Sequence, residues 1–192
     1  VSNLLSIIAW GRSQNKVSGV VDLTEVELTG ITLDGLDFTE IDLRGANLTR
    51  ASFHNATLEN TRLVQTQIDG TDFRWARKFS KVDLSSARGK GVSFQFLLMD
   101  NVIFHDARLE DADFSGATLT NVVFVDAELH RPVLLCSIDN ATASNAQITS
   151  PKLGTGPFRN IRGYGVRVLK ADLLEFRRRI PESQDLVYYA AN

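Results

Sequence analysis

The sequence has few of the residues that usually mark a disulfide framework, a metal site or a catalytic centre. Among its 192 residues are one cysteine, one methionine, three histidines and four prolines. The lone Cys136 excludes an internal disulfide and favours a reducing compartment. No apolar run approaches the length that spans a bilayer, and no signal peptide is visible, so no membrane span is predicted.

The charge is nearly balanced in total but unevenly distributed. The formal net charge is −2. Residues 21–150 contain 19 acidic and 11 basic side chains, whereas the flanks contain 4 acidic and 10 basic ones. Within the acidic stretch, residues 74–90 are locally basic. A solvated, soluble surface accounts for most of this charge.

The length predicts one domain with small terminal caps, and one pattern dominates it. Between residues 21 and 150 a large apolar residue recurs at every fifth position, with a smaller residue two positions before it. This period matches neither an α-helix nor a flat strand and predicts a repeat architecture. The large residues of the first phase are Leu23, Leu28, Leu33, Phe38, Leu43, Leu48, Phe53, Leu58, Leu63, Ile68 and Phe73.

Individual units such as VDLTE, VELTG, ANLTR, ADFSG and ATLTN carry a resemblance. They resemble the A-(D/N)-L-x-x units of the pentapeptide repeat family over about two thirds of the chain. The resemblance implies an all-β solenoid, a right-handed quadrilateral β-helix with one unit per side and four per coil. Residues twenty apart would then stack, which predicts a buried column through Phe53, Phe73, Phe94 and Phe114 rather than a ligand site.

The ends depart from the repeat. Residues 1–20 are expected to form an N-terminal cap, residues 21–150 the β-helix, and residues 151–192 a linker and a C-terminal helical cap. Leu169, Leu173, Phe176 and Ile180 lie at helical spacing before Pro181, and a further short helix is expected near the terminus. Because the chain starts with Val and ends abruptly, we expect it to be a fragment of a larger protein.

Two irregularities interrupt the repeat. RWARK at 74–78 contains one inserted residue, which places Arg77 at a small-residue position. Gly89, within SSARGKG at 85–91, replaces a large apolar residue and is expected in a bulge or short loop. An Arg and Trp patch has the composition of an interface hot spot, although an insertion that the solenoid tolerates on its side also explains it. The candidate residues are Arg74, Trp75, Arg77, Lys78, Lys81, Arg88 and Lys90.

A second candidate surface is apolar. Four β-branched residues occupy positions that should face water, and the stacking rule places them on one side of the rod. A partner, a second copy of the chain or the C-terminal segment would each cover such a patch. These residues are Val64, Ile103, Val123 and Val125.

The pattern offers no catalytic or cofactor chemistry. His54, His105 and His130 each follow a core residue and fall on three different sides, so no pair shares a metal. Cys136 occupies an inward position and is expected to be inert. We therefore predict no enzyme activity, no cofactor and no direct contact with nucleic acid.

Two functions remain open. The first is a protein–protein interaction module or scaffold within a larger bacterial effector, acting in the bacterial cytoplasm or after secretion into a host cell and binding a host or bacterial protein. The alternative, from resemblance to quinolone-resistance pentapeptide proteins, is a DNA-mimicking gyrase binder that forms a homodimer. The acidic repeat fits that alternative, and the basic middle departs from it.

Overall fold

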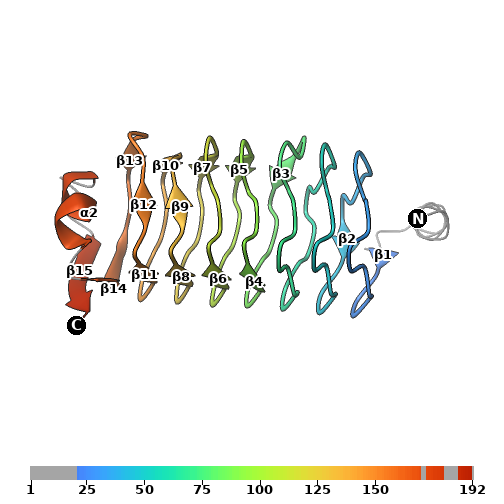
Figure 1. The fold of residues 1–192 in the computed structure, drawn as a ribbon, viewed down its shortest axis with the longest axis horizontal. Coiled ribbons are helices and arrows are strands. Elements are labelled where there is room, and N and C mark those ends of the chain that lie inside the picture. The colour runs from blue at the N-terminus through green and yellow to red at the C-terminus, as the bar shows by residue number, and fades with distance from the viewer. Residues whose placement is uncertain (1–20, 170–171, 180–185, 192) are drawn as a thin grey trace.

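The computed structural model describes residues 21–169, 172–179 and 186–191, and it shows an elongated all-β solenoid (Figure 1). Residues about twenty positions apart form parallel backbone bridges, for example Glu27 with Asn47 and Thr32 with Ser52. The bridges form four ladders, which define four sides of the rod. Side 1 contains Asp42 and side 2 contains Asn47; side 3 contains Ser52 and side 4 contains Thr57.

Short strands make up each side. Side 1 contains β1 (Val21–Asp22) and β2 (Ile41–Asp42), and side 3 contains β9 (Val133–Leu134) and β12 (Lys152–Leu153). Side 2 and side 4 lie opposite each other and carry the two larger sheets (Figure 1). Side 2 contains β4 (Arg88–Lys90), β6 (Arg108–Glu110), β8 (Glu128–His130), β11 (Gln147–Thr149), β14 (Gly163–Leu169) and β15 (Leu186–Ala191). Side 4 contains β3 (Phe79–Ser80), β5 (Leu98–Asp100), β7 (Thr118–Thr120), β10 (Ser137–Asp139) and β13 (Phe158–Arg159).

The large residue of each unit points into the rod, as predicted. On side 3 the rings of Phe53 and Phe73 stack at a centroid distance of 5.0 Å, and Phe94 and Phe114 stack at the same distance. All four rings are fully buried. The column is therefore core and not a ligand site, which confirms the sequence prediction.

The second inward residue of each unit, two positions before the large one, lies at a corner between sides and is usually small, although Ile41 and Leu97 are also fully buried there. Alanine is the commonest residue at these positions, and Thr61, Thr66 and Thr71 are also fully buried. Their hydroxyls donate to backbone carbonyl oxygens, such as that of Thr71 to Leu48 O at 2.8 Å. A buried hydroxyl with an acceptor avoids the cost of an unpaired polar group.

The last residue of nearly every unit adopts a left-handed conformation to turn the corner. Glycine and asparagine suit this conformation best, and Asn101, Asn121 and Asn140 occupy it with φ between 55° and 56°. Neighbouring asparagines also bond along the rod, with Asn140 Nδ2 donating to Asn121 Oδ1 at 2.5 Å. Turn chemistry thus adds to the pairing between coils.

Two changes of register occur between the coils of residues 21–159, and both fall between side 3 and side 4; the pairing of β14 with β15 shifts register as well, between Gly163 and Val166. Thr57 pairs with Lys78, one residue later than regular spacing, and Thr118 pairs with Ser137, one residue earlier. At the insertion Ala76 takes the buried corner position, and Arg77 is exposed. The prediction that Arg77 takes a small inward position is wrong, because a β-bulge after Ala76 accommodates the extra residue.

The expected loop at Gly89 is also wrong. Gly89 lies in β4, in register with Leu109, and is buried. A Cβ at this position would lie 2.7 Å from both Ile68 Cγ1 and Val92 Cγ2. The space that a larger residue would fill is therefore already occupied, and the strand remains regular.

The C-terminal region continues the solenoid beyond residue 150. Strands β12 and β13 add to sides 3 and 4, so this stretch is not a linker. The helix predicted from Leu169 is wrong in its first part, because β14 extends to Leu169 and α2 spans only Leu173–Arg179. Strand β15 replaces the expected terminal helix and pairs with β14. The N-terminal cap at residues 1–20 and Ile180 lie outside the described residues.

No helix within the described ranges has both the length and the apolar character needed to cross a membrane.

Candidate functional site: exposed surfaces that depart from the repeat

Two exposed aromatic rings project from the edge between side 3 and side 4. Trp75 and Phe96 stack with their ring centroids 4.4 Å apart and an interplanar angle of 12°. Trp75 is 53% exposed and Phe96 is 45% exposed. Leu98 follows on the outer face of β5 and is 75% exposed. We call Trp75, Phe96 and Leu98 the aromatic ledge.

Both aromatic residues occupy left-handed turn positions. The φ angles are 60° at Trp75 and 59° at Phe96, a region that bulky residues seldom adopt. Gly116 is the next turn residue along the same edge. If it were replaced by alanine, the new Cβ would lie 2.6 Å from the Phe96 ring. Glycine at this position therefore lets the Phe96 ring lie close to the next coil.

The cations near Trp75 divide into paired and unpaired ones. Arg74 forms an ion pair with Asp72 at 2.6 Å, and Lys78 forms one with Glu59 at 2.8 Å. Arg77 and Lys81 are exposed, and neither forms a close ion pair with another described residue, although Lys81 interacts at longer range with Glu59. Arg77 lies two residues after Trp75 and Lys81 lies at the turn after β3, so side 4 carries two cations without a close ion pair.

The paired carboxylates have perturbed pKa values. Burial alone would raise the pKa of Asp72, but hydrogen bonds from Arg74 outweigh it and lower the pKa. The Lys78 ammonium lowers the pKa of Glu59, and Glu59 raises that of Lys78. Both acids are therefore charged at neutral pH and remain bound to their cations.

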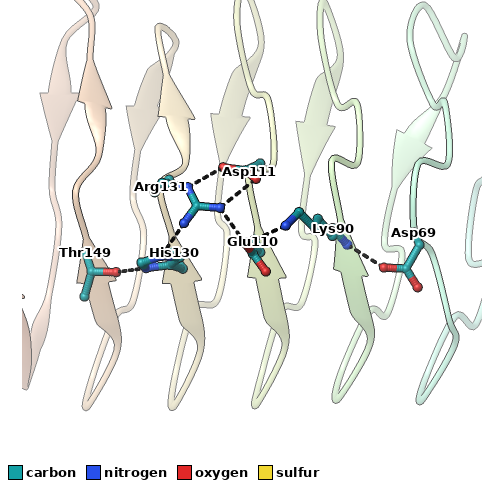
Figure 2. Close-up of polar contacts among 7 residues, drawn as sticks. All are labelled: Asp69, Lys90, Glu110, Asp111, His130, Arg131 and Thr149. Atoms are coloured by element: carbon teal, nitrogen blue, oxygen red, sulfur yellow. Dashed lines mark hydrogen bonds and ion pairs between the residues drawn. The ribbon is translucent and has the colours of Figure 1, made fainter.

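The structure places the other two predicted cations elsewhere. Arg88 and Lys90 belong to β4 on side 2, opposite side 4, so the six cations do not form one cluster. Figure 2 shows that Lys90 belongs to a chain of polar contacts along side 2. Its backbone N–H donates to Asp69 Oδ1 at 2.9 Å, and its ammonium contacts Glu110 Oε1 at the same distance.

Arg131 continues this chain (Figure 2). Its guanidinium donates to Asp111 at 2.7 Å and to Glu110 at 2.5 Å. Hydrogen bonds from Lys90 and then Arg131 lower the pKa of Glu110, those from Arg131 lower the pKa of Asp111, and the two acids raise the pKa of Arg131. The remaining nitrogen of Arg131 donates to His130 Nε2, so His130 Nδ1 carries the proton that bonds Thr149.

A shallow depression of about 320 Å³ lies on the same side. Its charged groups pair with one another across coils, as Arg108 does with Glu128 at 3.8 Å. They hold the coils together instead of converging on a common point. The lining residues are Asp69, Gly89, Lys90, Arg108, Leu109, Glu110, Glu128 and His130.

The apolar candidate patch is only partly contiguous. Ile103 and Val123 are bridged neighbours on side 1, and Val125 follows two residues later. Val64 lies in the same row as Val125, but Ser85 and His105 separate them, as the backbone bonds between successive turns show. Ile103 is 36% exposed, and the other three are half-buried.

Residues suited to nucleophilic or metal chemistry do not converge in the described structure. No group of three metal-ligating side chains occurs among the described residues. Cys136 is 3% exposed, and burial raises the pKa of its thiol to about 12. It is therefore a protonated core residue at neutral pH.

Comparison with known proteins identifies the repeat. The family described as pentapeptide repeats matches in eight copies, over residues 22–60, 37–74 and 103–131. This chain is a member of the pentapeptide repeat family. None of the curated protein sequences that were compared with it matches.

Solved pentapeptide repeat structures match it at low identity. HetL from the cyanobacterium Nostoc sp. strain PCC 7120, which is involved in heterocyst differentiation regulation, is 18% identical, with 86% of this chain and 95% of HetL covered and a TM-score of 0.34. QnrB1, a plasmid-mediated fluoroquinolone resistance protein, is 15% identical, with 84% and 93% covered and a TM-score of 0.35. Rfr23 from the cyanobacterium Cyanothece 51142 is 13% identical, with 97% and 99% covered and a TM-score of 0.18.

Sequence reasoning identified Trp75 but missed its partner. Phe96 follows the core residue Phe94 by two positions, at a turn position where pentapeptide repeats place small or polar residues. A large aromatic residue at that position was the available signal. Trp75 and Phe96 are 21 positions apart in the chain. Predicting that they stack requires a coil of twenty residues lengthened by the one inserted residue.

Proposed function

We propose that this pentapeptide repeat chain is a non-catalytic protein-interaction module and that the aromatic ledge is its partner-binding surface. The observation that carries the proposal is the conformation of Trp75 and Phe96. Two bulky rings are exposed in left-handed turns that asparagine or glycine would fill at lower cost.

The energetic balance supports a binding role. A residue in an unfavourable backbone region costs about 1–3 kcal/mol, whereas a stacked aromatic pair contributes only about 0.5–1.5 kcal/mol. The stack between Trp75 and Phe96 therefore does not offset two strained turns. Exposed tryptophans are also enriched among the residues that dominate binding energy at interfaces.

The rod suits the presentation of such a surface. Phe94 and Leu97 flank Phe96 in the chain and are fully buried, so the turn that carries Phe96 is fixed on both sides. A rigid surface loses little conformational entropy when it binds.

Site-specific photocrosslinking tests the proposal in cells of the source organism. A photoreactive phenylalanine derivative replaces Leu98 in one variant and Gln147, on side 2, in a matched control. We expect a discrete adduct from position 98 that disappears when Trp75→Asn is added, and none from position 147. Equal adducts from both positions, or adducts indifferent to Trp75→Asn, would refute the proposal.

The wider setting is proposed as well. We propose that the module belongs to a larger bacterial effector protein and acts in the bacterial cytoplasm or in a host cell. In the quadrilateral, right-handed β-helix expected from the family, residues 1–20 and α2 would cover the two ends. Deleting the repeat from the parent protein should then abolish partner capture and leave a neighbouring domain's activity intact.

The alternative is a DNA-mimicking binder of gyrase, and the acidic excess of residues 21–150 favours it. A supercoiling assay with purified protein separates the two functions. Inhibition or protection of gyrase at micromolar protein, unchanged by Trp75→Asn, would favour the alternative. An inactive protein would exclude it.

A further inference from the structure

We propose that the aromatic ledge binds an acidic segment of a partner protein through an apolar anchor residue. This inference rests on the proposed function and specifies the chemistry of the partner. It follows from which charges beside Trp75 are already paired and which are not.

The apolar part of the surface requires an apolar anchor. Leu98 is the most exposed large apolar side chain described, at 75%, and it lies two residues beyond Phe96 around a corner. Three apolar side chains from two adjacent coils thus lie along one edge. An aromatic or aliphatic side chain of the partner would remove apolar surface of all three from water.

The cationic part requires carboxylates. Four of the 11 basic residues in 21–150 fall within residues 74–81. Asp72 and Glu59 already neutralise Arg74 and Lys78. Partner carboxylates could therefore pair with Arg77 and Lys81 without breaking any of these existing pairs.

Two side-4 acids lie on the coils next to β3. Glu59 forms its ion pair with Lys78 and interacts only at longer range with Lys81, and Asp100 lies in register with Ser80. The carboxylate of Asp100 accepts hydrogen bonds from the amides of Asn101 and Asn121 at 2.8 and 2.9 Å. Residues 21–150 elsewhere carry a large excess of acid. An acidic segment would be repelled along the rod and attracted at the ledge, which adds specificity to affinity.

Selection from a random dodecapeptide phage-display library tests the proposal. The full chain is panned in parallel with Trp75→Asn/Phe96→Asn, in which asparagine keeps the left-handed turns favourable. We expect peptides enriched about tenfold or more on the wild type, a difference that a 1.4 kcal/mol loss of affinity produces. These peptides should carry net negative charge and an aromatic or leucine residue.

Two charge variants complete the design. Arg77→Glu/Lys81→Glu should bind the enriched peptides about tenfold more weakly than the wild type does. Binding of the same peptides to the wild type should weaken as the salt concentration rises. Arg88→Glu, on side 2, is the matched control and should retain it. Circular dichroism and thermal unfolding confirm that each variant is folded.

The outcomes separate the two proposals. Peptides that depend on Trp75 and Phe96 but are neutral or basic would overturn the acidic partner and leave the proposed function standing. Enrichment that is the same on the wild type and the Asn double variant would overturn both. Retention of binding by Arg77→Glu/Lys81→Glu would also overturn the acidic partner.

Discussion

Gly89 provides a test in which the repeat pattern and the structure predict opposite results. The five-residue pattern places a large apolar residue at position 89, so Gly89→Leu should complete the core and raise stability. In the structure Ile68 and Val92 already occupy that space. Gly89→Leu should therefore lower stability.

The magnitude follows from the distances. Carbon atoms pack at about 3.5 Å or more, so a Cβ at 2.7 Å from Ile68 Cγ1 and Val92 Cγ2 would have to displace each by about 0.8 Å. Overpacking typically costs about 1–3 kcal/mol, and replacing glycine in a strand returns about 0.5–1 kcal/mol. We expect Gly89→Ala to destabilise by about 1 kcal/mol and Gly89→Leu by about 3 kcal/mol.

Urea unfolding followed by circular dichroism measures these differences. A double-mutant cycle with Ile68→Ala supplies the control, because removing the Ile68 side chain should relieve the clash. Gly89→Ala should then cost about 1 kcal/mol less in the Ile68→Ala background. A higher unfolding midpoint for Gly89→Leu, or no coupling between the two positions, would refute this account of the packing.

Four further predictions concern stability and reactivity. Phe96→Asn should change the unfolding free energy by no more than about 1 kcal/mol, because relief of backbone strain offsets the lost stack, whereas Phe94→Ala should cost about 3–5 kcal/mol. Ala143→Val should fill part of an apolar cavity of about 40 Å³ and raise the unfolding free energy by about 1 kcal/mol, measured in urea. Burial would raise the pKa of Asp42, but arginine contacts lower it overall, so its stabilisation is present above the unfolded value near pH 4 and lost below it; Asp42→Asn should flatten the fall in melting temperature in acid. Cys136 should resist a thiol reagent at pH 8 in the folded protein and react in urea; rapid labelling of the native chain would contradict its burial.

The five-residue period predicted a repeat architecture and its inward residues, and the resemblance to the pentapeptide repeat family implied the solenoid. The large residue of each unit lies at the middle of a side and points into the rod. The period therefore predicts which residues are buried and which of them stack. Phe53, Phe73 and Phe94 lie where the period placed them. The bulge was less predictable, because the alignment of units alone does not show that Ala76 rather than Arg77 takes the corner.

Strand β14 was not predicted, because a helical pattern and a strand pattern overlap around Leu169. Leu169 and Leu173 have helical spacing, but Val166 and Val168 alternate with exposed residues as a strand requires. The edge of β11 decides between them, since it offers unpaired backbone groups to β14. The local pattern of residues around Leu169 does not show that the edge of β11 lies beside it.

The candidate site was predictable only where it violated the pattern. Trp75 was found because an inserted residue drew attention to it. Phe96 leaves the period intact, and its significance comes from the adjacent coil. Arg88 and Lys90 are close to Trp75 in sequence, but the winding of the coil carries them to the opposite side.

The residue inserted before Lys78 and the residue missing before Ser137 both fall at the edge between side 3 and side 4. Parallel pairing between coils continues on every side after the insertion and after the deletion. The edge between side 3 and side 4 therefore tolerates changes of chain length. Foreign loops grafted at Arg77 or Leu135 should therefore be displayed without disturbing neighbouring coils. Two grafts, one at each position, would project from the same edge and lie three coils apart. The backbone of the rod would fix the distance between the two displayed loops.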